Sequence, residues 1–182
     1  MPRVVDHDER REEILARCVD LFASHGYAAL PMRRIAAELG VSTGTLYHYF
    51  ESKTALFRAM MKWLVVRDVA AATAAVTPEM GAEVRYGVLV TFVESNVDAL
   101  QKALRIALDF DRQSADPADQ SILAETLAGY RKALQDQLGL GSAGEATLLV
   151  SVVLGALVQR MWEPAAIDVG AHLRRLGAVV AG

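Results

Sequence analysis

Several residue types that mark other protein classes are scarce in this sequence. The chain of 182 residues has one cysteine, Cys18, which excludes a disulfide framework and a cysteine-rich metal site. The four histidines are scattered, and no two of them lie at helical spacing from each other. Neither the spacing of a catalytic triad nor a glycine-rich phosphate loop is present. These absences argue against an enzyme, a metal site and a cofactor, and they leave Cys18 most simply as a core residue.

Long apolar runs are also missing. No such run follows the basic residues at the N-terminus, so no signal peptide is expected. The most apolar segment, 147–158, is far shorter than the roughly 20 residues that cross a bilayer. Together with the single cysteine, this pattern predicts a soluble cytoplasmic protein.

Charge is divided unevenly along the chain. The formal net charge of −3 argues weakly against a nucleic-acid partner. However, residues 1–67 contain ten Lys and Arg against eight Asp and Glu, whereas 68–182 contain nine against fourteen. The N-terminal part is therefore basic, at +2, and the remainder is acidic, at −5.

Apolar residues recur at spacings of three and four, and the alternation typical of strands is scarce, which predicts an all-α protein. Gly26 and Gly40 end the first two helices, Pro31 is expected at the first position of the second, and Ser42 and Ser52 cap the third and fourth. The expected helices cover approximately 8–24, 32–39, 43–49, 52–75, 80–100, 101–113, 118–138, 143–162 and 165–180.

The two short helices at 32–39 and 43–49 are joined by a few residues that include Gly40, which is the layout of a helix-turn-helix. The two helices and their turn have apolar side chains at the positions that must pack inward. These are Ile35, Ala36, Leu39, Val41, Leu46 and Tyr49 or Phe50. The remaining side chains of the second short helix are thereby forced outward.

That outward face consists of Thr43, Gly44, Thr45, Tyr47 and His48. A helix in the major groove needs short donors and acceptors at its N-terminal end for base edges, and longer donors farther along for phosphates. A glycine there would let the backbone approach DNA closely. The alternative is that the glycine is tolerated in a first turn and that the two rings are ordinary surface residues.

Two cations stand at helix starts, where the macrodipole disfavours positive charge by a few tenths of a kcal/mol. Lys53 opens the fourth helix and Arg33 lies in the first turn of the second. If these side chains and the helix N-termini both point at phosphates, the conflict disappears. Arg34 either joins them or is simply solvated.

The segment 14–57 resembles the DNA-binding domain of the tetracycline-repressor (TetR) family of one-component bacterial regulators, over about a quarter of the chain. The residues that carry the resemblance are Phe22, Gly26, Tyr27, Ile35, Ala36, Gly40, Val41, Gly44, Leu46, Tyr47, Phe50, Ser52, Lys53 and Leu56. The resemblance implies phosphate contacts from Tyr47 and Lys53, a phosphate or base contact from His48, and groove contacts from Ser42, Thr43 and Thr45.

The sequence departs from the family pattern in two places. Leu30 and Pro31 stand where the family usually has threonine or serine, and Thr43 replaces a common lysine or arginine. Because both changes remove caps or DNA contacts, a complex of modest affinity is expected.

The predicted domains are a helix-turn-helix domain at 1–51 and a helical effector-binding and dimerisation domain at 52–182. The resemblance implies that the last two helices pack across a two-fold axis. The segment 147–158 is apolar nearly all round and must be buried on two sides, either in a dimer or within its own subunit. The expected interface residues are Leu148, Ser151, Val152, Gly155, Val158, Leu173, Leu176 and Val180.

A small-molecule site is expected in the second domain, lined by rings and a few polar groups: Trp63, Phe92, Asn96, Phe110, Gln113 and Tyr130. The alternative is that these rings are ordinary core and that the two amides are solvated.

These features predict a ligand-responsive repressor that binds a palindromic operator as a homodimer and whose effector biases the separation of the two DNA-binding heads. One alternative is a non-specific or architectural DNA-binding protein without an effector. The other is a helical-bundle enzyme or carrier that shares only the front motif.

Overall fold

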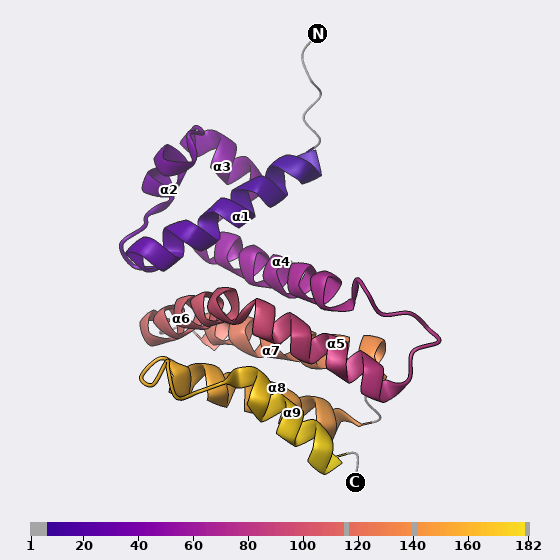
Figure 1. Cartoon of the computed structure of the whole chain (residues 1–182). Coiled ribbons are helices and arrows are strands. Elements are labelled where there is room, and N and C mark those ends of the chain that lie inside the picture. The colour runs from indigo at the N-terminus through magenta and orange to yellow at the C-terminus, as the bar shows by residue number, and fades with distance from the viewer. Residues whose placement is uncertain (1–6, 115–116, 140–141, 181–182) are drawn as a thin grey trace. The chain divides into compact units, whose positions relative to one another are not determined.

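A computed structural model describes residues 7–114, 117–139 and 142–180. Within these residues the chain is all-α, as expected, and contains no strand (Figure 1). The helices are α1 (His7–His25), α2 (Met32–Leu39), α3 (Thr43–Tyr49), α4 (Lys53–Thr73), α5 (Ala82–Ser95), α6 (Val97–Gln113), α7 (Pro117–Leu138), α8 (Ala143–Arg160) and α9 (Val169–Val180).

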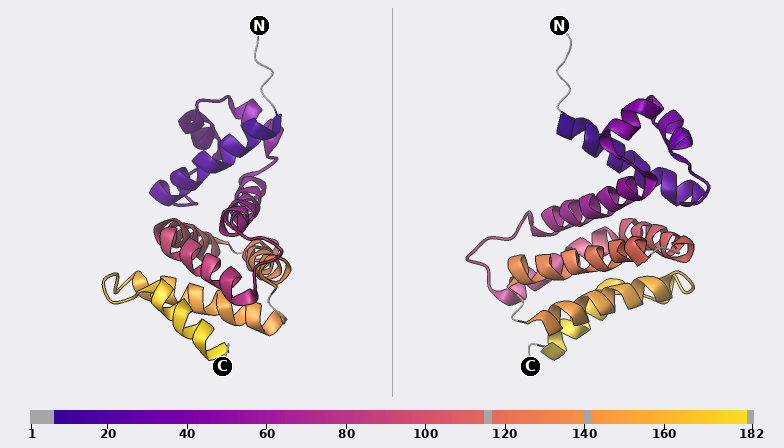
Figure 2. Two further views of the ribbon diagram at one scale, coloured as in Figure 1. Left: turned by 45° about the vertical axis from the view of Figure 1, so that its right-hand side comes forward. Right: turned by 180° about the vertical axis from the view of Figure 1, so that it is seen from behind.

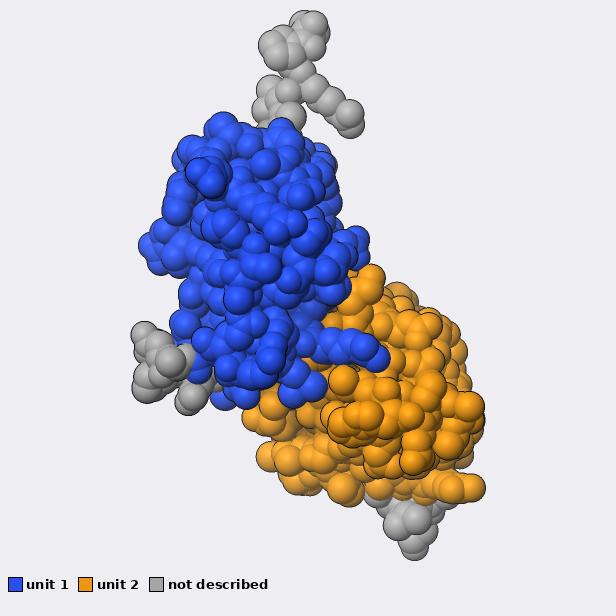
Figure 3. Space-filling view, turned by 90° about the vertical axis from the view of Figure 1, so that its left-hand side faces the viewer, with its two compact units in different colours: residues 1–64, 105–124 blue, residues 65–104, 125–182 orange. Residues whose placement is uncertain are grey.

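The chain divides into two compact units, which Figure 3 colours separately. Unit 1 comprises residues 1–64 and 105–124, and unit 2 comprises 65–104 and 125–182. Helices α4, α6 and α7 each contribute one part to each unit. The compact units therefore do not follow the boundary expected between 51 and 52, and the functional division at that boundary stays a prediction.

Local sequence signals fix the turns of unit 1. Gly26 and Gly40 have φ values of 76° and 70°, in the left-handed region that glycine adopts without a steric penalty. The N–H of Val41 donates to the carbonyl of Ala36 at 3.0 Å, which closes the end of α2. Pro31 is the cap residue before α2 rather than its first helical residue, and its carbonyl accepts from Ile35 at 3.1 Å.

The core of unit 1 joins α1 to the helix-turn-helix. Cys18 is fully buried, as expected, and burial raises the pKa of its thiol to about 12. Arg17 on the same helix donates to the carbonyls of Leu39 and Glu38 at 2.8 and 2.9 Å. These bonds satisfy carbonyl groups that the end of α2 leaves without helical partners.

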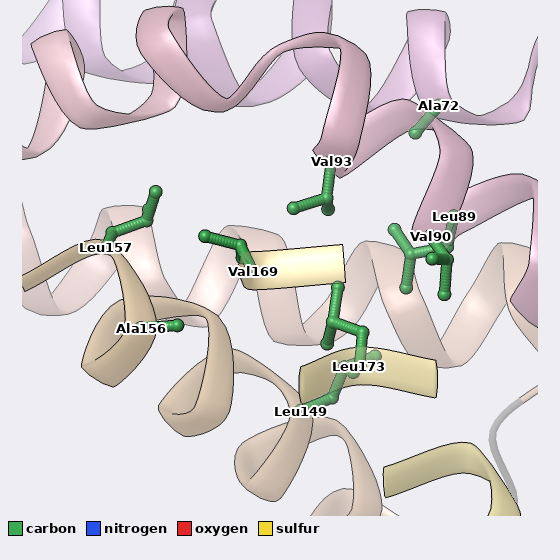
Figure 4. Close-up of a cluster of buried hydrophobic side chains, with 9 residues drawn as sticks. All are labelled: Ala72, Leu89, Val90, Val93, Leu149, Ala156, Leu157, Val169 and Leu173. Atoms are coloured by element: carbon green, nitrogen blue, oxygen red, sulfur yellow. The ribbon is translucent and has the colours of Figure 1, made fainter. Parts of the chain in front are cut away.

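The core of unit 2 lies between α5, α8 and α9, and Figure 4 shows its buried side chains. Helix α9 runs beside α5 and α8 (Figure 2). The hydroxyl of Tyr86 on α5 donates to the carbonyl of Leu173 at 2.6 Å, and Arg174 pairs with Glu94. A Cβ at Gly177 would lie 2.5 Å from the Tyr86 ring, so glycine allows this close crossing.

Three helix boundaries lie four or five residues from those expected: the end of α5, the start of α6 that follows it, and the start of α9. Helix α5 ends at Ser95 because Asn96 leaves the helical conformation and its side-chain amide donates to the Phe92 carbonyl at 2.8 Å. Helix α9 begins at Val169, because Asp168 accepts from the N–H of Ala171 at 2.8 Å and so caps the helix.

Helix α8 is apolar but largely uncovered. Its 18 residues have a mean hydropathy of 1.3, so by length and composition it is the one helix in the described part of the chain that could cross a membrane. Only 22% of that window is buried. Length and composition do not distinguish a membrane span from a helix that packs on protein. Its buried residues, Ala146, Leu149, Ala156 and Leu157, all lie on one side of the helix. The expected burial on two sides is therefore not reached within a single chain.

Candidate nucleic-acid interface

Helix α3 is held by its inner residues and leaves its outer face uncovered. Leu46 and the cap residue Phe50 are buried, whereas Gly44, Thr45 and Tyr47 are exposed. His48 is also exposed, and Thr43 is half-buried. The predicted DNA-contacting side of α3 is therefore open within unit 1.

Hydroxyl groups dominate the N-terminal end of this face. The Ser42 hydroxyl oxygen accepts from the N–H of Thr45 at 2.9 Å and so caps the helix. It also lies 2.8 Å from the Thr45 hydroxyl oxygen. The capping role of Ser42 is thus clear, while its contact with a groove stays a prediction.

The surroundings of Lys53 were not anticipated from the sequence. Its ammonium donates to the Tyr27 carbonyl at 3.0 Å and lies 4.0 Å from the centre of the Tyr27 ring. Partial burial lowers the pKa of this amine. A carbonyl and a ring face therefore compensate the positive charge at the start of α4, so the position of Lys53 no longer requires a phosphate to explain it.

The two arginines of α2 differ. Arg33 is exposed in the first turn, as the proposed phosphate contact requires. Arg34 lies 3.9 Å from Glu38 one turn along the helix, and its guanidinium reaches the Ala29 carbonyl at 3.5 Å. Such a surface pair contributes little to stability, so Arg34 fits the solvated alternative as well as a DNA contact.

Residues at the start of α1 adjoin the end of α3, which sequence reasoning missed. The His7 ring lies 4.5 Å from the Tyr49 ring and 5.7 Å from the His48 ring, measured between centres. The Arg11 guanidinium lies 5.2 Å from the centre of the Phe50 ring. No motif indicates these contacts, because they join segments far apart in the sequence. They add imidazole and guanidinium groups beside the C-terminal end of α3.

The expected interface residues lie mostly on the uncovered side of α8. Leu148 is 46% exposed, Ser151 is exposed, and the α8 residues Val152, Gly155 and Val158 are half-buried.

On α9 the prediction needs one correction. Leu173 is 0% exposed and belongs to the core of its own unit, so it is a core residue rather than an interface residue. Leu176 is half-buried, and the side chain of Val180 lies outside the described residues.

The expected ligand residues are divided between the units. Trp63, Phe110 and Gln113 fall in unit 1, and Phe92, Asn96 and Tyr130 fall in unit 2.

Several of these side chains already have partners within their own unit. Phe110 is fully buried and stacks on Phe57 at 4.1 Å. The Gln113 amide donates to Asp109 at 2.8 Å. Tyr130 donates to the buried Asp68 at 2.8 Å. Phe110 thus fits the core alternative, and lining of a ligand site stays a prediction for this set.

The sequence profile of the family described as "Bacterial regulatory proteins, tetR family" matches residues 14–60, from α1 through α2 and α3 into α4. This segment belongs to the TetR family of regulators. The resemblance of 14–57 is thereby confirmed.

Curated TetR-type relatives match over part of their length. The transcriptional repressor AcnR of Corynebacterium diphtheriae is 39% identical over 72 residues, which are 40% of this chain and 35% of that protein. The aligned segments cover a fifth to about a third of the first such relatives.

Solved structures of regulators share the fold of this chain. FadR from Bacillus subtilis in complex with stearoyl-CoA has a TM-score of 0.72 at 16% identity, covering 92% of this chain and 96% of that one. A putative regulator from Saccharomonospora viridis in complex with choline has a TM-score of 0.68 at 20% identity, covering 96% and 97%. At such identities the likeness concerns the fold alone.

Proposed function

We propose that the chain is a transcriptional repressor that binds a palindromic DNA operator as a homodimer and releases it in response to a small molecule. The observation that carries the proposal is the open outer face of α3. Its exposed Thr45, Tyr47 and His48 supply a short hydroxyl near the helix start and longer donors one turn on. This order matches the needs of base edges followed by phosphates.

The surface of α8 supports the homodimer. Leu148 is 46% exposed on a helix whose mean hydropathy is 1.3, and Trp162, just beyond its end, is 74% exposed. An apolar helix that is left largely uncovered is more typical of a protein interface than of free surface. A two-fold pairing of α8 and α9 would cover it, and the resulting dimer would carry two α3 helices for the two half-sites of an operator, which lie about 34 to 36 Å apart.

Similar folds support a small-molecule effector. One such structure contains stearoyl-CoA and another contains choline, so the fold accommodates ligands of different chemistry. In unit 2 of this chain the buried Asp68 accepts from Tyr130 at 2.8 Å and from Arg67 at 2.6 Å. This polar group inside a helical core is where we place the polar end of an effector. The effector acts by favouring a state that does not fit the operator, through its differential affinity for the two states.

Selection from random DNA tests the proposal. The purified protein is incubated with a randomised duplex library, and bound fragments are sequenced over several rounds. A repressor of this kind enriches an inverted repeat, and scrambling either half-site lowers affinity by a thousandfold or so at moderate salt. Equal affinity for all fragments would instead establish the non-specific alternative. Absence of binding at low ionic strength would overturn both.

A further inference from the structure

Tyr27 lies in the loop between α1 and α2, and its backbone N–H and carbonyl form hydrogen bonds with side chains of two other helices. Its N–H donates to Oδ2 of Asp109 on α6 at 2.8 Å, and its carbonyl accepts from Nζ of Lys53 on α4 at 3.0 Å. The phenol oxygen also lies 3.2 Å from the Thr54 hydroxyl oxygen. All of these residues belong to unit 1. A single residue therefore connects the last turns of α6 to the first turn of α4.

The packing around Tyr27 makes this connection stiff. Its ring meets Phe110 edge-on at 4.9 Å and Phe57 edge-on at 5.4 Å, and those two rings stack at 4.1 Å. A Cβ on Gly26 would lie 3.2 Å from Asp109, so glycine permits the close approach of the carboxylate. Because packed interiors transmit displacement rather than absorb it, Tyr27 moves with the end of α6.

Asp109 is itself fixed in orientation by its own helix. Its Oδ1 accepts from Gln113 at 2.8 Å and from Arg112 at 3.1 Å, while Oδ2 accepts from the Tyr27 N–H. The Tyr27 N–H is the main cause that holds the pKa of this carboxyl below its usual range. The carboxylate is charged at neutral pH, which strengthens its bond to the peptide.

Lys53 depends on Tyr27 for its position. An ammonium group has three N–H donors, so a bond to the Tyr27 carbonyl can coexist with a bond to a phosphate oxygen. A long lysine side chain that is already held loses less freedom when it binds phosphate. The carbonyl and the ring thus prepare the ammonium for the contact with DNA.

We propose that Asp109 is a positioning residue for the Lys53 contact with DNA: the carboxylate fixes the Tyr27 peptide, and Tyr27 fixes the ammonium. The inference rests on the proposed function. It assigns the end of α6 a direct influence on operator affinity through three named residues. A displacement of this turn would release Lys53 and weaken binding even if α3 kept its structure.

Operator binding of variants tests the link by fluorescence anisotropy with the selected duplex. Asp109→Ala should weaken binding about fivefold, as expected for the loss of one hydrogen-bonded constraint. Asp109→Asn keeps an acceptor for the Tyr27 N–H and should stay within about twofold of the parent. Asp111→Ala removes the same charge from an exposed site on the same helix and is the matched control. In a Lys53→Met background, Asp109→Ala should have no further effect.

A measurement made without DNA tests this inference independently of the proposed function. The pKa of the Lys53 amine is measured by NMR of lysine labelled at Cε. Asp109→Ala should raise this pKa toward the ordinary lysine value, because the amine leaves its partly buried position, while Asp109→Asn and Asp111→Ala should match the parent. If Asp109→Ala does not fold, Asp109→Glu replaces it, since it keeps the charge and moves the carboxylate by one methylene.

An unchanged Lys53 pKa in folded Asp109→Ala would overturn the inference. So would an equal loss of affinity in the Lys53→Met background. A parent protein that binds no duplex would overturn the proposed function, while the pKa measurement would still decide whether Asp109 positions Lys53.

Discussion

Helices α3 and α8 both present a face that their own unit leaves uncovered, and the chemistry of the two faces is opposite. The face of α3 carries Thr45, Tyr47 and His48, whose hydroxyl and imidazole groups can bond to solvent or to another polar surface. The face of α8 carries Leu148, an apolar side chain whose transfer out of water is favourable. The uncovered face therefore indicates a polar partner at α3 and an apolar partner at α8.

The two helices also differ in how they begin. Ser42 caps α3 with one side-chain bond, whereas Ser142 and Glu145 form a reciprocal capping box at α8, with bonds of 3.1 and 3.2 Å. Both starts are defined by the chain itself, so each helix presents a preformed face. We infer from the contrast that α3 meets a hydrated polyanion and α8 meets a second copy of the chain.

A charge on the α8 face gives the largest expected effect. Leu148→Glu would bury a carboxylate against the partner, which costs several kcal/mol, so the dimer should dissociate and operator affinity should fall about a hundredfold or more. Val84→Glu, at a valine 54% exposed on α5, is the matched control and should remain dimeric. Sedimentation velocity measures the mass. A dimeric Leu148→Glu protein would show that the α8 face is not the interface.

Removal of the Lys53 ammonium gives the next largest effect. Lys53→Ala should weaken binding to all duplexes alike, by about tenfold, and should lower the salt dependence by about one phosphate contact. Tyr47→Phe should act in the same direction with a smaller loss. Lys132→Ala removes an exposed lysine from α7 and should leave the slope unchanged. Parental affinity and slope for Lys53→Ala would remove Lys53 from the interface.

A change at the start of α3 should affect sequence preference instead. Thr45→Ala should weaken binding about fivefold at particular base pairs and little elsewhere, because it removes a short hydroxyl from a base edge. Thr91→Ala on α5 removes a hydroxyl that bonds to its own helix at 3.0 Å and serves as the control. Competition with single-base operator variants measures the effect. A uniform loss over all variants would assign Thr45 to the backbone contacts.

A methyl group on α8 gives a subtler test of the dimer. A Cβ at Gly155 would meet nothing within 4 Å in the single chain, and alanine stabilises a helix interior by about 1 kcal/mol relative to glycine. Gly155→Ala should therefore stabilise the monomer while weakening the dimer severalfold, because the partner helix approaches there. Gly87→Ala is equally unobstructed on α5 and should leave dimerisation unchanged. Dilution experiments that show a tighter Gly155→Ala dimer would contradict this contact.

The smallest expected effect is on the stability of the folded protein at acidic pH. The native pKa of Asp109 lies below its unfolded value of about 3.9, so its stabilisation is present above that pH and is lost as pH falls through the native pKa. Asp109→Asn should lack this contribution, and its stability should change less between pH 5 and the acid limit of folding. Urea unfolding over that range measures the difference, with Asp111→Asn as control. If the free energy of unfolding of Asp109→Asn changed with pH as steeply as that of the parent, the Tyr27 bond would not be a source of the parent's pH-dependent stability.

Local signals in the sequence predicted most of unit 1. Gly26, Gly40, Ser42 and Ser52 each specify a turn or cap through their own backbone or side-chain chemistry, and the structure confirms each role. The span 32–39 of α2 was predicted correctly, but Pro31 is its cap rather than its first helical residue, because proline fits both positions.

Features that depend on distant contacts were not predictable. Nothing in the spacing of Asp109 and Tyr27 indicates that a carboxylate on α6 bonds to the peptide of an early loop. Leu173 was assigned to the interface because helical periodicity gives a stripe but not its partner, and α5 covers that stripe within the chain. The end of α5 was missed because an apolar pattern continues past Asn96, whose side chain bonds to its own helix.

Hydrogen–deuterium exchange with and without the selected operator tests the central claim most directly. The account predicts that duplex binding slows exchange at the amides of 43–48 and at the start of α4, and leaves α5 unchanged. Unaltered exchange in α3 while the duplex is bound, with protection confined to other helices, would contradict it.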